Sequence, residues 1–80
     1  MTRAPRGGVS LAGMELTVNG AARTFDPAPR TLAELVGRLD LKGKRIAVEK
    51  NGEIVPKSRY DATVLATGDR LEIVAAVGGG

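Results

Sequence analysis

Apolar and polar residues alternate along the first well-patterned stretch of the chain. Apolar side chains occupy every second position from Met14 to Val18, which is the period of a strand with one buried face. Asn19-Gly20 follows at once, and this dipeptide favours the positive φ angles of a tight two-residue hairpin turn. The pattern therefore predicts a strand, a hairpin turn and a second strand over 21–25.

The next stretch changes to the period of an α-helix. Thr31 and Glu34 have the spacing of a capping box, in which the Thr31 hydroxyl accepts from the Glu34 amide and the Glu34 carboxylate accepts from the Thr31 amide. We therefore expect a helix that begins at Thr31 and covers the sheet with a single apolar stripe. The stripe has the spacing i, i+3, i+4, i+7 and consists of Leu32, Leu35, Val36 and Leu39.

Shorter extended segments follow the predicted helix. Residues 46–49 alternate again, Asn51-Gly52 predicts another tight turn, and 53–55 form a short extended piece that ends at Pro56. Residues 57–63 are polar apart from Tyr60, and we interpret them as a turn or short helix anchored by that ring.

The last strand is predicted from Arg70 to Val77, after a turn at Gly68-Asp69. Its inward face is expected to hold Leu71, Ile73, Ala75 and Val77. This strand leads directly into the glycines that end the sequence.

This order of elements predicts an α+β fold of the β-grasp type, with one mixed sheet of four to five strands and one main helix across it. The first and last strands are expected to lie parallel at the centre of the sheet. A ferredoxin-like fold would need a second full helix, and 57–63 is too short to supply one.

The composition argues against catalysis by side chains. The 80 residues include no Cys and no His, so thiol nucleophiles, imidazole bases and the usual zinc ligands are missing. We expect no metal site, no bound cofactor and no enzyme activity of the chain itself.

Charge and hydropathy favour neither nucleic acid nor a membrane as a partner. From Met14 onward, 10 basic residues face 9 acidic ones, and only Lys42-Gly43-Lys44-Arg45 forms a basic cluster, which we interpret as a solvated loop. No apolar stretch approaches the roughly 18 residues of a membrane span. The expected location is the cytoplasm.

Three regions are predicted along the chain. Residues 1–13 contain Pro, Gly and Arg without periodicity, which is typical of a disordered extension. Residues 14–77 form the domain, and 78–80 form a flexible glycine tail.

The glycine tail is the candidate reactive group. Glycines have no Cβ, so three of them can enter a narrow channel, and they extend about 10 Å. A carboxylate is a poor electrophile, but adenylation with ATP by a partner would activate it. Attack by a persulfide and cleavage of the sulfur link would then leave a thiocarboxylate.

Several segments together resemble the ThiS family of bacterial thiamine-pathway sulfur carriers. The resemblance runs from Met14 to Gly80, although Lys57 and Tyr60 stand where the family more often has Arg and Trp. The segments are MELTVNG at 14–20, TLAEL at 31–35, NGEIVPKSRY at 51–60, GDRLEIV at 68–74 and VGGG at 77–80.

The resemblance implies a β-grasp sulfur carrier that is a protein co-substrate. An E1-like, ThiF-like adenylyltransferase would consume ATP to adenylate Gly80, with Gly79 as its essential neighbour and Gly78 lengthening the arm. A donor such as a cysteine desulfurase would supply the sulfur, and the thiocarboxylate would pass it to a ThiG-like thiazole synthase.

Three other functions remain open on sequence grounds. Small subunits of molybdopterin synthase share the fold and chemistry, but usually carry a proline in the segment after the last strand, which this chain lacks. A ubiquitin-like modifier would use the same activated tail. A passive binding module would use only the exposed face of the last strand, where Glu72, Val74 and Ala76 are the expected partner-binding residues in every case.

Overall fold

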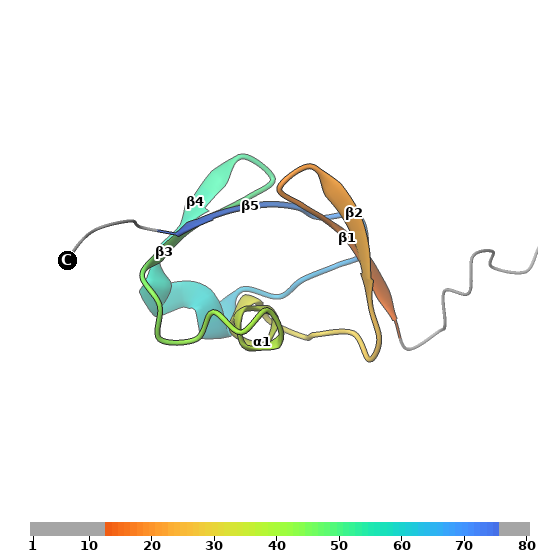
Figure 1. Cartoon of the computed structure of the whole chain (residues 1–80), viewed down its shortest axis with the longest axis horizontal. Coiled ribbons are helices and arrows are strands. Elements are labelled where there is room, and N and C mark those ends of the chain that lie inside the picture. Colours follow the sequence, from red (N-terminus) through yellow and green to blue (C-terminus); the bar gives the residue numbers. More distant parts are fainter. Residues whose placement is uncertain (1–12, 76–80) are drawn as a thin grey trace, which may run out of the picture.

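The computed structural model describes residues 13–75 of the chain. One helix lies across one face of a single sheet, and a short 3-10 helix joins the last two strands (Figure 1). The elements in chain order are β1 (Met14–Val18), β2 (Ala21–Phe25), α1 (Leu32–Arg38), β3 (Ile46–Lys50), β4 (Glu53–Val55), the 3-10 helix η2 (Lys57–Ala62) and β5 (Arg70–Ala75).

The sheet has five strands in the order β2-β1-β5-β3-β4. Strands β1 and β5 are parallel, and the other neighbouring pairs are antiparallel. The last strand thus lies at the centre of the sheet beside the first one, with the helix beneath them (Figure 1). This is the β-grasp arrangement, as the sequence predicts.

Both predicted Asn-Gly turns are present. Asn19 and Gly20 have φ angles of 52° and 84°, and Asn51 and Gly52 have 53° and 90°. Two consecutive positive φ angles match the right-handed twist of the flanking strands. Each turn therefore fixes the register of its hairpin, with Val18 opposite Ala21 in the first.

The helix begins as predicted, but one half of its capping box differs. The Thr31 hydroxyl accepts from the Glu34 amide at 3.3 Å. The Glu34 carboxylate, however, accepts from the Arg30 amide at 2.7 Å, whereas the sequence predicted the Thr31 amide. Two backbone bonds hold residues 30–32 against residues 63–65, and this pairing leaves the Arg30 amide within reach of the carboxylate.

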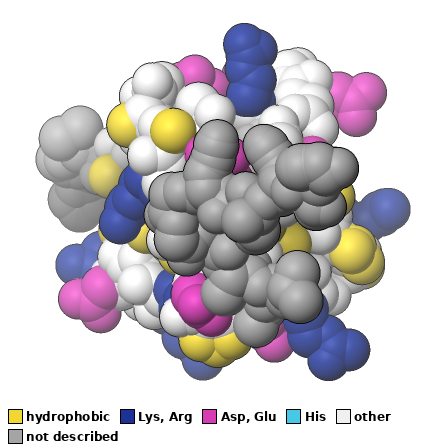
Figure 2. Space-filling model, turned by 90° about the vertical axis from the view of Figure 1, so that its right-hand side faces the viewer, with side chains coloured by type: hydrophobic (Ala, Val, Ile, Leu, Met, Phe, Trp, Pro, Cys, Tyr) yellow, Lys and Arg dark blue, Asp and Glu magenta, His cyan; other side chains and the backbone are white. Residues whose placement is uncertain are grey.

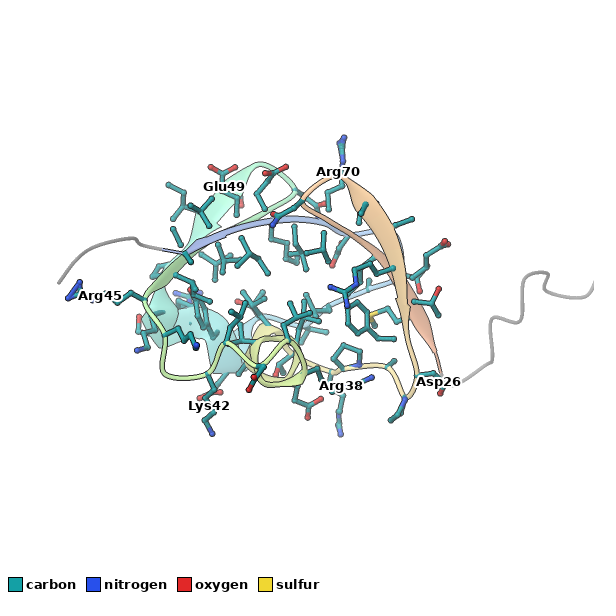
Figure 3. The ribbon with its side chains drawn as sticks, in the orientation of Figure 1. Asp26, Arg38, Lys42, Arg45, Glu49 and Arg70 are labelled. Carbon is teal, nitrogen blue, oxygen red and sulfur yellow. The ribbon has the colours of Figure 1, made fainter. Side chains whose placement is uncertain are left out.

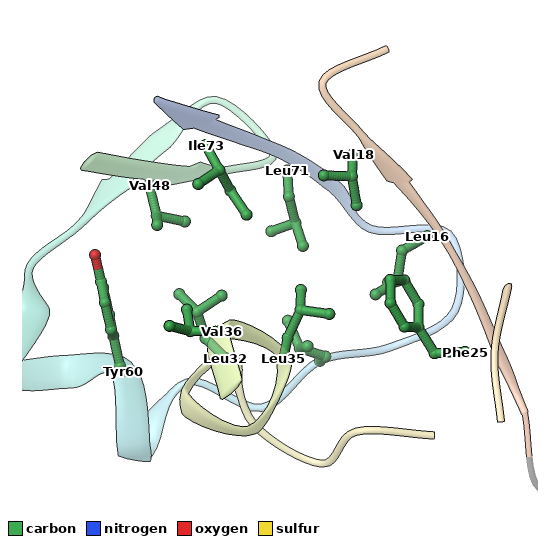
Figure 4. Packing of buried hydrophobic residues seen from close by; sticks show 11 residues of the cluster. Leu16, Val18, Phe25, Leu32, Leu35, Val36, Val48, Tyr60, Leu71 and Ile73 are labelled. Atoms are coloured by element: carbon green, nitrogen blue, oxygen red, sulfur yellow. The ribbon is translucent and has the colours of Figure 1, made fainter. Parts of the chain in front are cut away.

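The core lies between the helix and the inner face of the sheet (Figure 4). Three of the four predicted stripe residues are buried, but Leu39 is only half-buried because α1 ends at Arg38 and Leu39 is its C-cap. Tyr60 is buried, as predicted. The buried hydrophobic residues are Leu16, Val18, Phe25, Leu32, Leu35, Val36, Val48, Tyr60, Leu65, Leu71 and Ile73.

The inward face of β5 is shorter than predicted. Leu71 and Ile73 are buried, but Ala75 is exposed. Ala75 borders a recess of about 300 Å³ together with Leu39 and Leu41, and its methyl group is too small to fill that space. Val77, predicted on the same face, lies outside the described residues.

Neither helix of residues 13–75 is long and apolar enough to cross a bilayer.

Candidate functional site

Strand β5 is the described element that leads toward the predicted reactive glycines. It lies between β1 and β3, and its last residue, Ala75, is opposite Ile46. It runs toward the end of the molecule that holds the loop between α1 and β3 and the 3-10 helix (Figure 1). Ala76 and Gly78, Gly79 and Gly80 lie outside the described residues.

The side chain of Asn19 continues the sheet beyond the end of β1. The Asn19 backbone amide donates to the Leu71 carbonyl at 2.8 Å. Its side-chain Oδ1 then accepts from the Ile73 amide at 2.7 Å, and its Nδ2 donates to the Ile73 carbonyl at 3.0 Å. One side chain therefore pairs with β5 as a strand residue would, although β1 has already turned away.

Asn51, in the second turn, holds the start of β5 from the opposite side. Its backbone amide donates to the Arg70 carbonyl at 2.8 Å, and its Oδ1 accepts from the Arg70 amide at 2.8 Å. Its Nδ2 donates to the Asp69 carboxylate at 3.0 Å, which also accepts from the Ala66 amide at 2.9 Å. Both turn asparagines thus clamp β5, a role that sequence reasoning missed.

Substitution of Asn19 by alanine is expected to destabilise the domain by about 2–4 kcal/mol. The change leaves the part-buried polar groups of Ile73 without partners, at roughly 1–3 kcal/mol each, and strains a positive φ angle. Chemical denaturation measures the loss. Asn19→Gly removes the side-chain amide without backbone strain and should cost less than the alanine variant. An alanine variant as stable as the native chain would contradict the clamp.

The outer face of the sheet, away from α1, carries an exposed apolar surface with charged neighbours. Val74 is 62% exposed and Ile54 is 74% exposed. Both border a shallow recess of about 630 Å³ that Glu72 also lines. Glu49 and Arg70 lie on the same outer side (Figure 3). The predicted partner-binding residues Glu72 and Val74 are thus accessible on this face.

The side chains of residues 13–75 form no cluster of three or more His, Cys, Asp or Glu residues that could hold a metal ion. Burial raises the pKa of the Tyr60 phenol above its ordinary value.

The sequence matches the ThiS family model over residues 16–80. The match covers most of the chain and includes its last residue. The chain belongs to the ThiS family.

Named relatives agree with this assignment to ThiS. The sulfur carrier protein ThiS of Bacillus subtilis is 37% identical over 65 residues, which cover 81% of this chain and 98% of that protein. The crystal structure of the thiamine biosynthesis protein ThiS from Geobacter metallireducens has a TM-score of 0.72 and 38% identity, and the match covers 84% of this chain and all of that one.

The thiazole synthase of Paramagnetospirillum magneticum is a longer protein that contains a segment similar to this chain. It is 48% identical over 67 residues, which cover 84% of this chain but only 20% of the synthase. The chain therefore spans about a fifth of that relative.

Proposed function

We propose that this ThiS-family chain is a sulfur carrier for thiamine biosynthesis and that its reacting group is the terminal carboxylate of Gly80. The observation that carries the proposal is the family match, which continues through residue 80. The central position of β5 also supports the proposal. The strand that precedes the tail in the sequence is held by hydrogen bonds on both sides, so its position in the domain is fixed.

The carboxylate would react in three steps. It attacks the α-phosphate of ATP, and pyrophosphate leaves to give an acyl adenylate. A persulfide then attacks the acyl carbon and AMP leaves, which forms an acyl disulfide. A second thiol attacks the outer sulfur and forms a disulfide of its own, and the thiocarboxylate remains on Gly80. The carrier supplies only the carboxylate, while its partners supply the thiols and the active sites.

Loading sulfur onto the tail requires two kinds of partner, and unloading it requires an acceptor. An E1-like adenylyltransferase would activate the tail, and a cysteine desulfurase would supply persulfide sulfur. The thiazole synthase of P. magneticum supports the choice of acceptor, because a segment similar to this chain lies within that protein. The presence of a carrier-like segment and a synthase in one polypeptide supports the proposal that this chain acts with a thiazole synthase.

Partners would dock on the outer face of the sheet. Glu72 and Val74 belong to β5, and Ala76, which lies outside the described residues, follows β5 in the sequence, so contacts with these residues would aim the tail at the partner's active site. The apolar area around Val74 and Ile54, bordered by charge, has the composition of a small protein interface.

Replacement of Val74 by aspartate is expected to raise the KM for the carrier about tenfold in ATP–pyrophosphate exchange with the adenylyltransferase, because docking would then bury an unpaired carboxylate in an apolar contact. The kcat should stay within about twofold, since the chemistry is unchanged. Val64→Asp is the matched control, because Val64 is 70% exposed and lies outside the sheet. Equal KM values for both variants would exclude this face.

The proposed function is tested by intact mass. The chain is incubated with ATP, a cysteine desulfurase with cysteine, and the adenylyltransferase of the same organism. We expect one terminal oxygen to be replaced by sulfur, and fragmentation to place the change on Gly80. A mass that stays constant, while the same adenylyltransferase still loads another ThiS-family carrier with sulfur, would refute the proposal.

A further inference from the structure

One edge of β3 lacks a partner strand over its first residues. Strand β4 pairs only with Val48 to Lys50, and the next position along β4 is Pro56, which cannot donate to a ladder. The chain then turns into η2. Lys50 and Glu53 flank a two-residue turn, so they form a hydrogen-bonded pair. Every second residue of β3, counted back from Lys50, therefore directs its backbone amide and carbonyl toward the β4 side. Ile46 is one of these residues, and its amide and carbonyl lie on the uncovered edge.

A groove of about 710 Å³ lies along this edge. Its floor is apolar and includes Val36, Leu41 and Tyr60. Asp61 is the one acidic residue among those that line the groove. The rim carries four cations from two separate segments, Lys42, Lys44 and Arg45 from the loop after α1 and Lys57 from η2.

The groove concentrates positive charge in a domain that is otherwise slightly acidic. Of the ten basic and nine acidic residues in 13–75, four basic and one acidic residue line it. The rest of the described chain therefore has more acidic than basic groups. Arg45 and Lys42 project from the end of the molecule that holds the groove (Figure 3). At the opposite end, basic and acidic side chains are interspersed (Figure 2).

We propose that this groove binds an extended, acidic peptide segment of a protein partner. The free edge at Ile46 offers main-chain hydrogen bonds to a strand. Alternate side chains of that strand would point to the apolar floor, and the others would reach the rim cations. Acidic residues fit because they match the local charge.

Two features favour a peptide over nucleic acid and connect the groove to the docking face. The groove's aromatic ring, Tyr60, is buried, which removes it as a platform for base stacking. Ala47 and Val74 line both the groove and the recess on the outer face of the sheet. A partner docked on that face could therefore extend an acidic segment into the groove, which deepens the proposed function.

The test uses a capped peptide of about seven residues in which Glu and Val alternate, long enough to form a strand. It is titrated into the ¹⁵N-labelled full chain and followed by NMR. We expect shifts in Lys42 to Ala47 and in η2, together with slower hydrogen exchange of the Ile46 amide. A Gln-Val peptide should bind about fivefold more weakly, and roughly 0.5 M salt should remove the difference. A Glu-Val peptide with a central proline should lose the protection of Ile46.

Charge reversal supplies the matched variants. Lys44→Glu should weaken binding of the Glu-Val peptide about fivefold. Arg30→Glu should weaken it less than about twofold, because exposed charges interact only over short distances. Arg30 is exposed and lies outside the groove. Equal binding of the Gln-Val and Glu-Val peptides, shifts confined to the outer face, or tighter binding of oligothymidylate would each overturn the proposal.

Peptide binding needs no sulfur transfer, so the two proposals fail separately. A chain that gains sulfur but ignores the peptide refutes only the groove, and a chain that binds the peptide but gains no sulfur refutes only the carrier mechanism.

Discussion

A chain extended by one alanine after Gly80 should acquire no sulfur, although its fold and its affinity for partners stay the same. The extension turns the Gly80 carboxylate into an amide and moves the new carboxylate about 3.5 Å further along the partner's channel. When an active site enforces geometry, a displacement of about 1 Å can already cost a hundredfold in rate. The side chain of alanine also narrows the conformations open to the tail.

Adenylate-dependent pyrophosphate exchange and intact mass measure this effect. The native chain, the extended chain and a chain that lacks Gly80 are compared, with a chain extended by alanine at its other end as the control. Thermal unfolding at the native temperature would show that the extended chain is folded. If the chain extended after Gly80 exchanged pyrophosphate at the native rate and gained sulfur, the terminal-carboxylate mechanism would be wrong.

Replacement of Leu35 by alanine is expected to lower the free energy of unfolding by about 2–5 kcal/mol. Leu35 is fully buried on the helix stripe, so the change loses apolar burial and leaves a cavity beneath β5. In a domain this small, such a loss is a large fraction of the total stability.

Urea denaturation followed by circular dichroism gives the free energy. Val64→Ala is the control, because Val64 is 70% exposed and surface changes usually stay within about 0.5 kcal/mol. A Leu35 variant with the native midpoint and slope would contradict the described core.

The parts of the fold that local physics determines could be predicted from the sequence. Each Asn-Gly pair specifies a tight turn whatever surrounds it, and the spacing of Leu32, Leu35 and Val36 defines one helix face. The ends of elements depended on what packs nearby. Leu39 continued the periodicity but became a C-cap, and Ala75 continued the strand pattern beyond the part of the sheet that the core fills.

Contacts between distant segments could not be predicted in this way. The Asn19 side chain meets Ile73, 54 positions away, and this contact depends on which strands are neighbours. The same holds for the groove, because Lys57 joins the cations of the loop after α1 only once η2 has folded beside it. Sequence reasoning interpreted that loop as solvated, and its residues 42–45 are indeed exposed. The tail chemistry lies outside the described residues and stays a prediction.

The clamping of β5 on both sides has a mechanical consequence. The hydrogen bonds to β3 run across the strand, and those of Asn19 act from the other side. A force along β5 toward its carboxyl end loads these bonds in shear, so they resist together instead of opening one after another as they would when a strand is peeled from an edge. If a partner enzyme draws the glycine arm into a narrow channel, as we propose, these bonds would hold β5 in the sheet against the pull.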